Sequence, residues 1–117
     1  MKKTRIYIFI LLLLGFVQHS CIAQNTKIDS LEKLLLTDKE DTNKVIHLVR
    51  LCNDYRSIGS LDTSLQYGLQ AFHLAKKMNY KRGMADSHAG LGNIFFAQGN
   101  YSEALKNHFD ALRLREE

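Results

Sequence analysis

The side chains best suited to chemistry in this sequence are its five histidines and two cysteines, which could bind a metal ion or act as nucleophiles. Metal sites on helices use closely spaced pairs such as His-x-x-x-His or Cys-x-x-Cys. His73, His88 and His108 belong to no such pair, and His47 lies five residues before Cys52, at a different angle on a helix. We therefore expect no metal site and no cofactor.

Nucleophilic catalysis has equally little support. Ser87 and His88 are adjacent, and adjacent residues on a helix do not face each other, so the imidazole could not activate the hydroxyl. Gly90-x-Gly92 follows no predicted strand, unlike a phosphate-binding loop. We expect Cys52 to be a small buried residue and the chain not to be an enzyme. A small exported enzyme, the alternative, would need polar residues clustered on facing helices.

A basic cluster at Lys76, Lys77, Lys81 and Arg82 is the remaining polar feature. Positive charge is favourable near a helix C-terminus, so a solvated helix end is the simpler interpretation. Contact with a phosphate or an acidic partner is the alternative.

Helices must position all of these residues. The chain lacks proline, and apolar residues recur at spacings of three and four, which predicts an all-α fold. Thr26 and Asp29 have the spacing of a capping box, Asp62 is the expected N-cap of a later helix, and Gly59 and Gly99 are expected helix ends. The predicted helices span about residues 26–36, 42–57, 62–78 and 82–97, and about 102 to the C-terminus.

Each predicted helix has an apolar face that is expected to pack inwards. Small residues at Gly92, Ala104 and Ala111 should let helices approach closely, and Leu91, Phe95, Tyr101 and Leu105 should fill the gaps between them. The expected inward residues are Ile28, Leu31, Leu34 and Leu35, then Val45, Leu48, Leu51, Cys52 and Tyr55, then Leu65, Leu69, Phe72 and Ala75, and finally Leu105, Ala111, Leu112 and Leu114.

The first 23 residues have the layout of a secretory signal peptide. Lys2, Lys3 and Arg5 precede an apolar block of 12 residues, 6–17, which is shorter than the about 20 needed to span a bilayer. Cleavage after Ala23 is favoured. The alternative is that Cys21 is a lipoprotein cysteine. Ser20 fits such a motif, but Gln18 stands where leucine is usual. We expect export across the inner membrane, to a periplasmic or membrane-associated location.

The formal net charge of +4 comes mostly from this leader. Residues 1–23 hold three of the 16 Lys and Arg residues, so 13 basic and 12 acidic residues follow them. No basic stripe remains, which argues against a nucleic-acid partner. One cysteine remains, so no internal disulfide is expected.

The strongest pattern in the sequence is a self-match at a shift of 40 residues. Such internal similarity is typical of a solenoid of stacked helical hairpins. The identical pairs are Leu51 and Leu91, Asn53 and Asn93, Gly59 and Gly99, Leu65 and Leu105, Ala71 and Ala111, and Leu74 and Leu114.

The second unit, L-G-x-x-F-x-x-x-G-N-Y-x-E-A-L-x-x-x-x-x-A-L over residues 91–112, resembles the tetratricopeptide repeat (TPR) family. His88 replaces the common tryptophan, His108 an aromatic residue, the terminal proline is missing, and the period exceeds the usual repeat of about 34 residues. The resemblance covers about residues 44–117 and implies TPR-like units at about 44–83 and 84–117. The expected organisation is therefore a signal peptide at 1–23, a leader helix and loop at 24–43, and these two units.

The resemblance also implies a concave groove for a protein or peptide partner of unknown identity. By motif position, the residues that would line this groove are Val49, Asn53, Arg56, Ala89, Asn93 and Phe96. A lysine clamp for a peptide carboxylate is not implied, because Val49 and Ala89 stand where that lysine would be.

The stretches IDSL (28–31), KEDTNKV (39–45) and AKKMNYKRG (75–83) resemble the exported N-terminal regions of Bacteroidetes sensor histidine kinases and cyclases. This resemblance implies a non-catalytic module at the start of a longer signal-transduction protein. A free-standing exported or lipid-anchored TPR adaptor or assembly factor is the alternative. Because about three repeats are usually needed for stability, we expect residues 24–117 alone to be marginally stable or to self-associate through the last hairpin.

Overall fold

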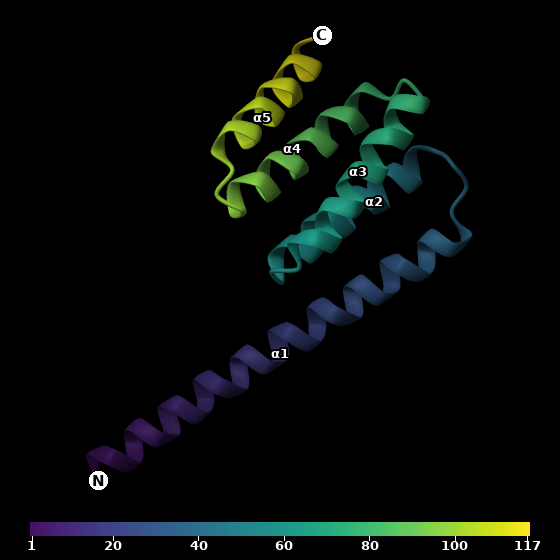
Figure 1. Ribbon diagram of the computed structural model, residues 1–117. Helices are drawn as coiled ribbons and strands as arrows, with labels where there is room; N and C mark the ends of the chain where they lie inside the picture. Colours follow the sequence, from purple (N-terminus) through teal and green to yellow (C-terminus); the bar gives the residue numbers. More distant parts are fainter.

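The computed structural model describes the backbone of residues 1–117 and the side chains of residues 1–15 and 22–117. The fold is all-α, as predicted, and no strand occurs among these residues. The lipidation candidate Cys21 lies outside the described side chains. Five helices follow one another: α1 (Lys2–Thr37), α2 (Thr42–Ser57), α3 (Leu61–Lys77), α4 (Lys81–Ala97) and α5 (Tyr101–Glu116) (Figure 1).

Helices α2 to α5 form two consecutive hairpins that pack on each other. Each of these helices contacts the next one along the chain, and α2 also contacts α4, the first helix of the following hairpin. This arrangement is a helical-hairpin solenoid, which confirms the fold class predicted from the 40-residue period. In Figure 1, α5 lies at the end of the stack farthest from α1.

The turns inside the two hairpins have one geometry. Gly59 and Gly99 adopt φ values of 83° and 78°, in the left-handed region that glycine accepts without steric penalty. In the first turn, the Gly59 N–H donates to the Arg56 carbonyl and the Ser60 N–H to the Tyr55 carbonyl, which is the Schellman pattern. The prediction that both glycines end helices is confirmed.

The turn between the hairpins repeats this geometry without glycine. Asn79 has a φ of 53°, and its N–H donates to the Lys76 carbonyl at 3.1 Å. Asparagine enters the left-handed region more readily than other non-glycine residues. The predicted turn at Asn79 and Tyr80 is therefore confirmed.

The start of the first helix was predicted wrongly. Helix α1 begins at Lys2, so Thr26 lies in its interior, and its hydroxyl donates to the Ile22 carbonyl at 2.9 Å. A helical residue whose N–H already has a partner in the preceding turn cannot act as a cap. The Thr26–Asp29 capping box is therefore absent.

The next two helices begin in different ways, and the predicted N-cap of α3 is wrong. The Asp41 carboxylate caps α2 by accepting from the backbone N–H groups of Asn43 and Lys44, at 2.9 and 3.1 Å. Helix α3 begins at Leu61, so Asp62 is in its first turn and is not its N-cap. Asp62 still favours the helix, because negative charge near the N-terminus complements the helix dipole.

Helix α3 contacts its neighbours through small residues. Its buried positions are Ser64, Gly68, Ala71 and Ala75, whereas Leu69, predicted to face inwards, is exposed. A Cβ atom on Gly68 would lie 2.9 Å from Leu91 Cδ2. The backbone of α3 therefore lies too close to α4 for a leucine side chain on this face.

Helix α5, like α3, packs on its neighbour through its smaller residues, and it leaves its own large apolar residues outside. It buries Ala104, Asn107 and Ala111 against α4, as predicted for the two alanines. Tyr101, Leu105 and Leu112 were expected to pack inwards, but all three are exposed. The physical reason is that only α4 packs on α5 among the described residues.

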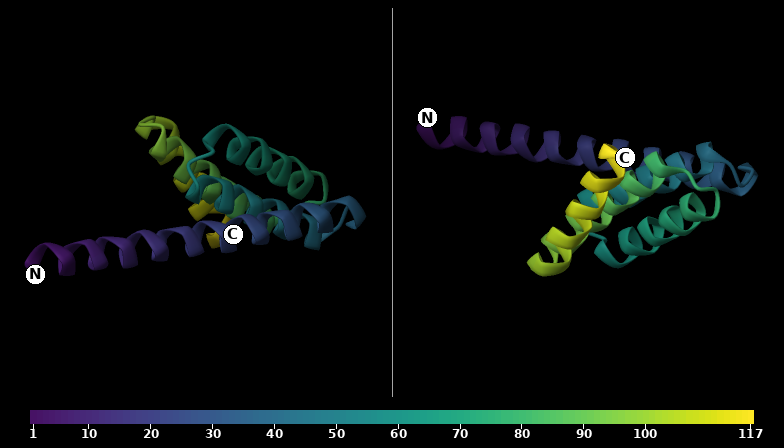
Figure 2. Two further views of the ribbon diagram at one scale, coloured as in Figure 1. Left: turned by 90° about the horizontal axis from the view of Figure 1, so that it is seen from below. Right: turned by 90° about the horizontal axis from the view of Figure 1, so that it is seen from above.

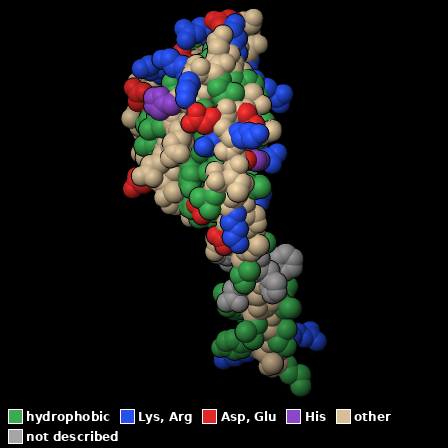
Figure 3. Space-filling model, turned by 90° about the vertical axis from the view of Figure 1, so that its right-hand side faces the viewer, with side chains coloured by type: hydrophobic (Ala, Val, Ile, Leu, Met, Phe, Trp, Pro, Cys, Tyr) green, Lys and Arg blue, Asp and Glu red, His purple; other side chains and the backbone are tan. Residues whose placement is uncertain are grey.

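In both views of Figure 2, the N-terminal half of α1 extends beyond the stack formed by α2 to α5. The radius of gyration is 18.2 Å, against about 13 Å for a compact domain of this length. Hydrophobic side chains surround this projecting part (Figure 3). Among the described residues, no helix combines the length and the apolar character that a bilayer span requires.

Candidate functional site

The predicted groove residues lie on the first helix of each hairpin. Val49, Asn53 and Arg56 are spaced i, i+4 and i+7 along α2, and therefore share one face of that helix. Ala89, Asn93 and Phe96 have the same spacing on α4. Because α2 and α4 contact each other, the two faces lie in one layer of the solenoid.

These side chains are accessible to a ligand. Asn93 and Phe96 are exposed, and the other four groove residues are partly buried. The Asn53 amide oxygen lies 4.0 Å from the position that a Cβ atom on Gly90 would occupy. The Asn53 side chain therefore reaches the surface of α4, where a glycine leaves room beside it.

One end of this layer is hollowed. A cavity of about 180 Å³ lies between the N-terminal half of α2 and the start of α4. Val49 belongs both to this cavity and to the predicted groove. The cavity combines aliphatic and aromatic side chains with one basic and one acidic residue; its lining is Val45, Ile46, Val49, Arg50, Tyr80, Gly83 and Asp86.

Arg56 gives the groove an available positive charge. Its Nε atom is buried and has no hydrogen-bond partner among the described residues. A guanidinium group offers five N–H donors and stays protonated at any physiological pH. Arg56 is partly buried and forms no ion pair among the described residues, so its positive charge is not neutralised within this part of the chain.

Among the described residues, Cys52, Ser87 and His88 form no hydrogen bonds to one another. The Ser87 hydroxyl donates to the Gly83 carbonyl at 2.7 Å, and His88 Nδ1 lies 3.0 Å from Asn107 Oδ1. Burial raises the pKa of the Cys52 thiol, which disfavours the reactive thiolate. Ser87 therefore bonds within α4, whereas His88 contacts Asn107 of α5.

The basic cluster is largely neutralised. Lys77 Nζ lies 2.9 Å from a Glu40 carboxylate oxygen, and this hydrogen bond lowers the pKa of Glu40. Arg82 and Asp86 form an ion pair one helical turn apart, at 4.0 Å. These contacts favour the interpretation of a solvated helix end over a phosphate site.

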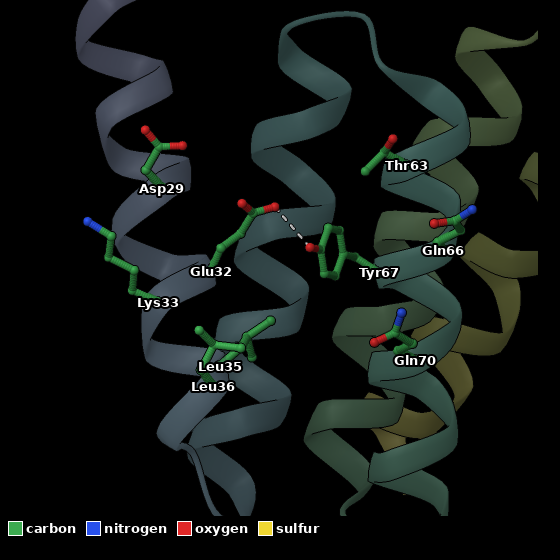
Figure 4. A pocket seen from close by; sticks show the side chains of 9 residues that line it. All are labelled: Asp29, Glu32, Lys33, Leu35, Leu36, Thr63, Gln66, Tyr67 and Gln70. Carbon is green, nitrogen blue, oxygen red and sulfur yellow. Dashed lines mark hydrogen bonds between the residues drawn. The ribbon is translucent and has the colours of Figure 1, made fainter.

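A second, larger hollow was not predicted. It lies between α1 and α3, has a volume of about 690 Å³, and is drawn in Figure 4. Its lining combines charged, hydroxyl and amide side chains with two leucines and a tyrosine. The lining residues are Asp29, Glu32, Lys33, Leu35, Leu36, Thr63, Gln66, Tyr67 and Gln70.

A tyrosine–glutamate cluster beside this hollow connects α1 to the first hairpin. The hydroxyls of Tyr55 and Tyr67 donate to Glu32 Oε1 at 2.6 and 3.0 Å, and the two rings stack with centroids 5.5 Å apart. The bond to Glu32 raises the pKa of Tyr55 to about 12, and burial raises that of Tyr67. Both phenols are therefore neutral near pH 7, and the cluster positions α1 without supplying a base.

One sequence signal could have indicated this cluster. Tyr55 falls on Phe95 in the 40-residue register, so the first unit carries a hydroxyl that the second unit lacks. This hydroxyl needs a hydrogen-bond partner that the second unit does not require. Here that partner is Glu32 of α1.

The described chain is thus a helical-hairpin solenoid with an open polar and aromatic face on α2 and α4. No model of a known protein family matches the chain, and no curated protein matches it significantly. A proposal for its function must therefore depend on the fold, the repeat pattern and the geometry of this face.

Proposed function

We propose that this chain is a non-catalytic TPR module that binds a peptide segment of a protein partner across α2 and α4. The observation that carries the proposal is the pair Asn53 and Asn93, which occupy equivalent positions on these two contacting helices. Side-chain amides both donate and accept, so two of them in register can hydrogen-bond the backbone of an extended peptide.

The remaining groove residues define the peptide chemistry that this face would select. The guanidinium of Arg56 favours an acidic side chain or a carboxylate. Phe96 on α4 and Val49 on α2 offer apolar contacts at opposite ends of the face. The preferred segment would therefore carry an acidic residue close to an aliphatic or aromatic one.

We further propose that the module is exported and forms the N-terminal sensory or scaffold part of a longer signal-transduction protein of the histidine kinase or cyclase type. The charge and hydropathy of residues 1–23 support export, and the family resemblance supports the sensor context. A small exported or lipid-anchored TPR adaptor is the second candidate. Mass spectrometry of the mature N-terminus, together with the coding sequence after Glu117, distinguishes the two.

A random peptide library displayed on phage tests the groove directly. Peptides selected on the unmodified chain should lose about tenfold in affinity for Asn53→Ala and for Asn93→Ala, because each variant removes hydrogen bonds to the peptide backbone. Arg56→Ala should relax the selection of acidic residues. The measurement is fluorescence anisotropy of labelled selected peptides.

Gln66→Ala and Gln70→Ala are the matched controls, since these polar residues line the other hollow, between α1 and α3. They should leave the affinity unchanged. Peptides whose binding is insensitive to the asparagine variants but sensitive to the glutamine variants would refute the proposed groove and assign binding to the α1–α3 hollow.

A further inference from the structure

The cavity between α2 and α4 is lined on one side by Tyr80, which comes from the turn between the two hairpins. A Cβ atom on Gly83 would lie 2.8 Å from Tyr80 Cε1 and 2.8 Å from Val45 Cγ1, so both side chains lie directly on the backbone of α4. Glycine at position 83 leaves the space that they occupy. Tyr80 and Val45 thus form a wall of the cavity that no motif position of the repeat indicated.

Helix α2 lines the cavity with three aliphatic side chains and one arginine. Val45 is buried, Val49 is partly buried and Ile46 is exposed, so the aliphatic surface extends from the core to the mouth of the cavity. Arg50 is exposed and forms no hydrogen bond or ion pair among the described residues. The α2 side of the cavity therefore combines an apolar wall with an unpaired positive charge.

The acidic residue on the α4 side of the cavity is already paired. Arg115 Nη2 donates to a carboxylate oxygen of Asp86 at 3.1 Å, and Arg82 Nε lies 4.0 Å from the other oxygen. Two guanidinium groups thus share one carboxylate, so Asp86 is not available to neutralise Arg50. The mouth of the cavity keeps an excess of positive charge, which attracts an acidic group.

The cavity has the volume of one large side chain. Its volume of about 180 Å³ equals that of about six water molecules at about 30 Å³ each, which is enough for the side chain of leucine, methionine or phenylalanine. A pocket for a whole small molecule usually has a volume of about 300 Å³ or more. The size therefore favours a single side chain of a peptide over a free ligand.

The cavity also lies within reach of the proposed groove. Asn53 follows Val49 by one helical turn of α2, a rise of about 6 Å. An extended peptide advances about 3.3 Å per residue. A peptide whose backbone meets Asn53 can therefore place a side chain one or two residues away in the cavity.

We infer that this cavity, which we call the anchor pocket, binds one bulky aliphatic or aromatic side chain of the partner peptide, next to an acidic residue that pairs with Arg50. The inference rests on the proposed peptide-binding function and deepens it. Asn53 and Asn93 contact the peptide backbone, which is alike in all sequences, so selection of a sequence falls to other residues. The apolar side chain displaces water from Ile46 and Tyr80, and the carboxylate accepts charge-assisted hydrogen bonds from Arg50.

Selection of a random peptide library on the 117-residue chain, followed by fluorescence anisotropy of the selected peptides, tests the anchor pocket. The selected peptides should share a leucine, methionine or phenylalanine beside an aspartate or glutamate. Alanine in place of the apolar residue should weaken binding about 20-fold, the effect of leaving a buried leucine-sized side chain out.

Two variants of the chain should change which peptides it prefers. Ile46→Phe narrows the anchor pocket, so it should weaken binding of the selected peptides about tenfold and bind their alanine-substituted forms more tightly than the unmodified chain does. Arg50→Glu should weaken binding about tenfold, and lysine in place of the acidic peptide residue should recover most of this loss.

Leu69→Phe and Lys106→Glu are the matched controls, because they make the same kinds of change at exposed residues of α3 and α5, outside the groove and the cavity. Both should leave the affinity unchanged. Circular dichroism should show unchanged helix content in all four variants, since each altered side chain is exposed.

The outcomes separate the anchor pocket from the groove. Selected peptides that share no large apolar residue, or that lose affinity for Asn53→Ala but not for Ile46→Phe and Arg50→Glu, would overturn the anchor pocket and leave the groove proposal intact. Peptides that respond to Ile46→Phe and Arg50→Glu but not to the asparagine variants would support the anchor pocket and refute the backbone contacts. A library that yields no binding peptide would overturn both.

Discussion

The two hairpins of this solenoid share a sequence pattern but differ in what covers them. Helix α1 packs on one side of the first hairpin and α4 on the other, whereas the second hairpin has a described neighbour on one side only. The consequence is visible at equivalent positions. Leu65 packs against the core formed by Cys52, Leu91 and Ile94, whereas Leu105 is 58% exposed.

The comparison shows that burial in a repeat is decided by the next unit and not by the residue itself. Each hairpin buries its small face internally and leaves its large residues for the neighbour. We therefore expect the two hairpins to differ in stability, with opening beginning at α5 and proceeding towards α2. Three pairs of variants sharpen this difference, from the largest expected effect to the smallest.

The largest effect is expected in the core of the first hairpin. Leu51 is 0% exposed and packs against Ile28 and Leu31 of α1, so Leu51→Ala leaves a cavity between two helices. It should lower the free energy of unfolding by about 3 kcal/mol, a typical value for buried leucine. Urea denaturation followed by circular dichroism measures this change.

Leu105→Ala, at an exposed leucine of the second hairpin, is the comparison variant. At low protein concentration, where any association through α5 is absent, it should change the free energy of unfolding by less than about 0.5 kcal/mol. Equal losses for the two variants would contradict the difference in coverage between the hairpins.

A smaller contrast is expected between two helical glycines. A Cβ atom on Gly68 would meet Leu91 Cδ2 at 2.9 Å and Cys52 Sγ at 3.1 Å, both from buried side chains. Gly68→Ala should therefore lower the free energy of unfolding by about 1 kcal/mol, because overpacking outweighs the better helix propensity of alanine. Thermal denaturation of this variant beside the unmodified chain measures the change.

Gly92→Ala is the control in the second hairpin. Its Cβ atom would lie 2.8 Å from the ring of His108, an exposed residue of α5 that can change rotamer. This variant should be neutral or slightly stabilising, since the helix gains a better former. A larger loss in the free energy of unfolding for Gly92→Ala than for Gly68→Ala would show that His108 cannot move aside, and that α5 packs on α4 as tightly as α3 does.

The sequence predicted the features that depend on local interactions. Helix α2 begins and ends where its apolar period and Gly59 indicated, and the register places Gly99 in the equivalent turn. These features follow from backbone geometry and helix periodicity, which short stretches of sequence contain.

The features it missed depend on neighbours. Thr26 resembles a cap only if no helix precedes it, and Leu105 and Leu112 resemble core only if another helix packs on α5. The hydroxyl contacts to Glu32 likewise join residues 23 and 35 positions apart, which no local pattern indicates. The residues of the proposed groove were predicted from the sequence. The structure added the contact between α2 and α4, the helices that carry these residues.

The smallest predicted effect is a pH dependence confined to the first hairpin. Tyr55 has a pKa of about 12 in the folded chain, raised from about 10 chiefly by its hydrogen bond to Glu32. A raised pKa in the folded state means that the stabilisation is fully present below pH 10 and is lost as the pH rises towards 12. Tyr55→Phe should remove this part of the pH dependence, which urea denaturation at several alkaline pH values measures.

Near pH 7 the same variant should lower the free energy of unfolding by about 1 kcal/mol, the usual net contribution of a single hydrogen bond, because Glu32 keeps a second donor. Here the second donor is Tyr67, which still bonds to Glu32. Tyr101→Phe is the control in the second hairpin, since its exposed ring lies at a position that α1 does not reach. An alkaline loss of stability in Tyr55→Phe as large as that of the unmodified chain would show that the Tyr55 phenol does not contribute this pH dependence.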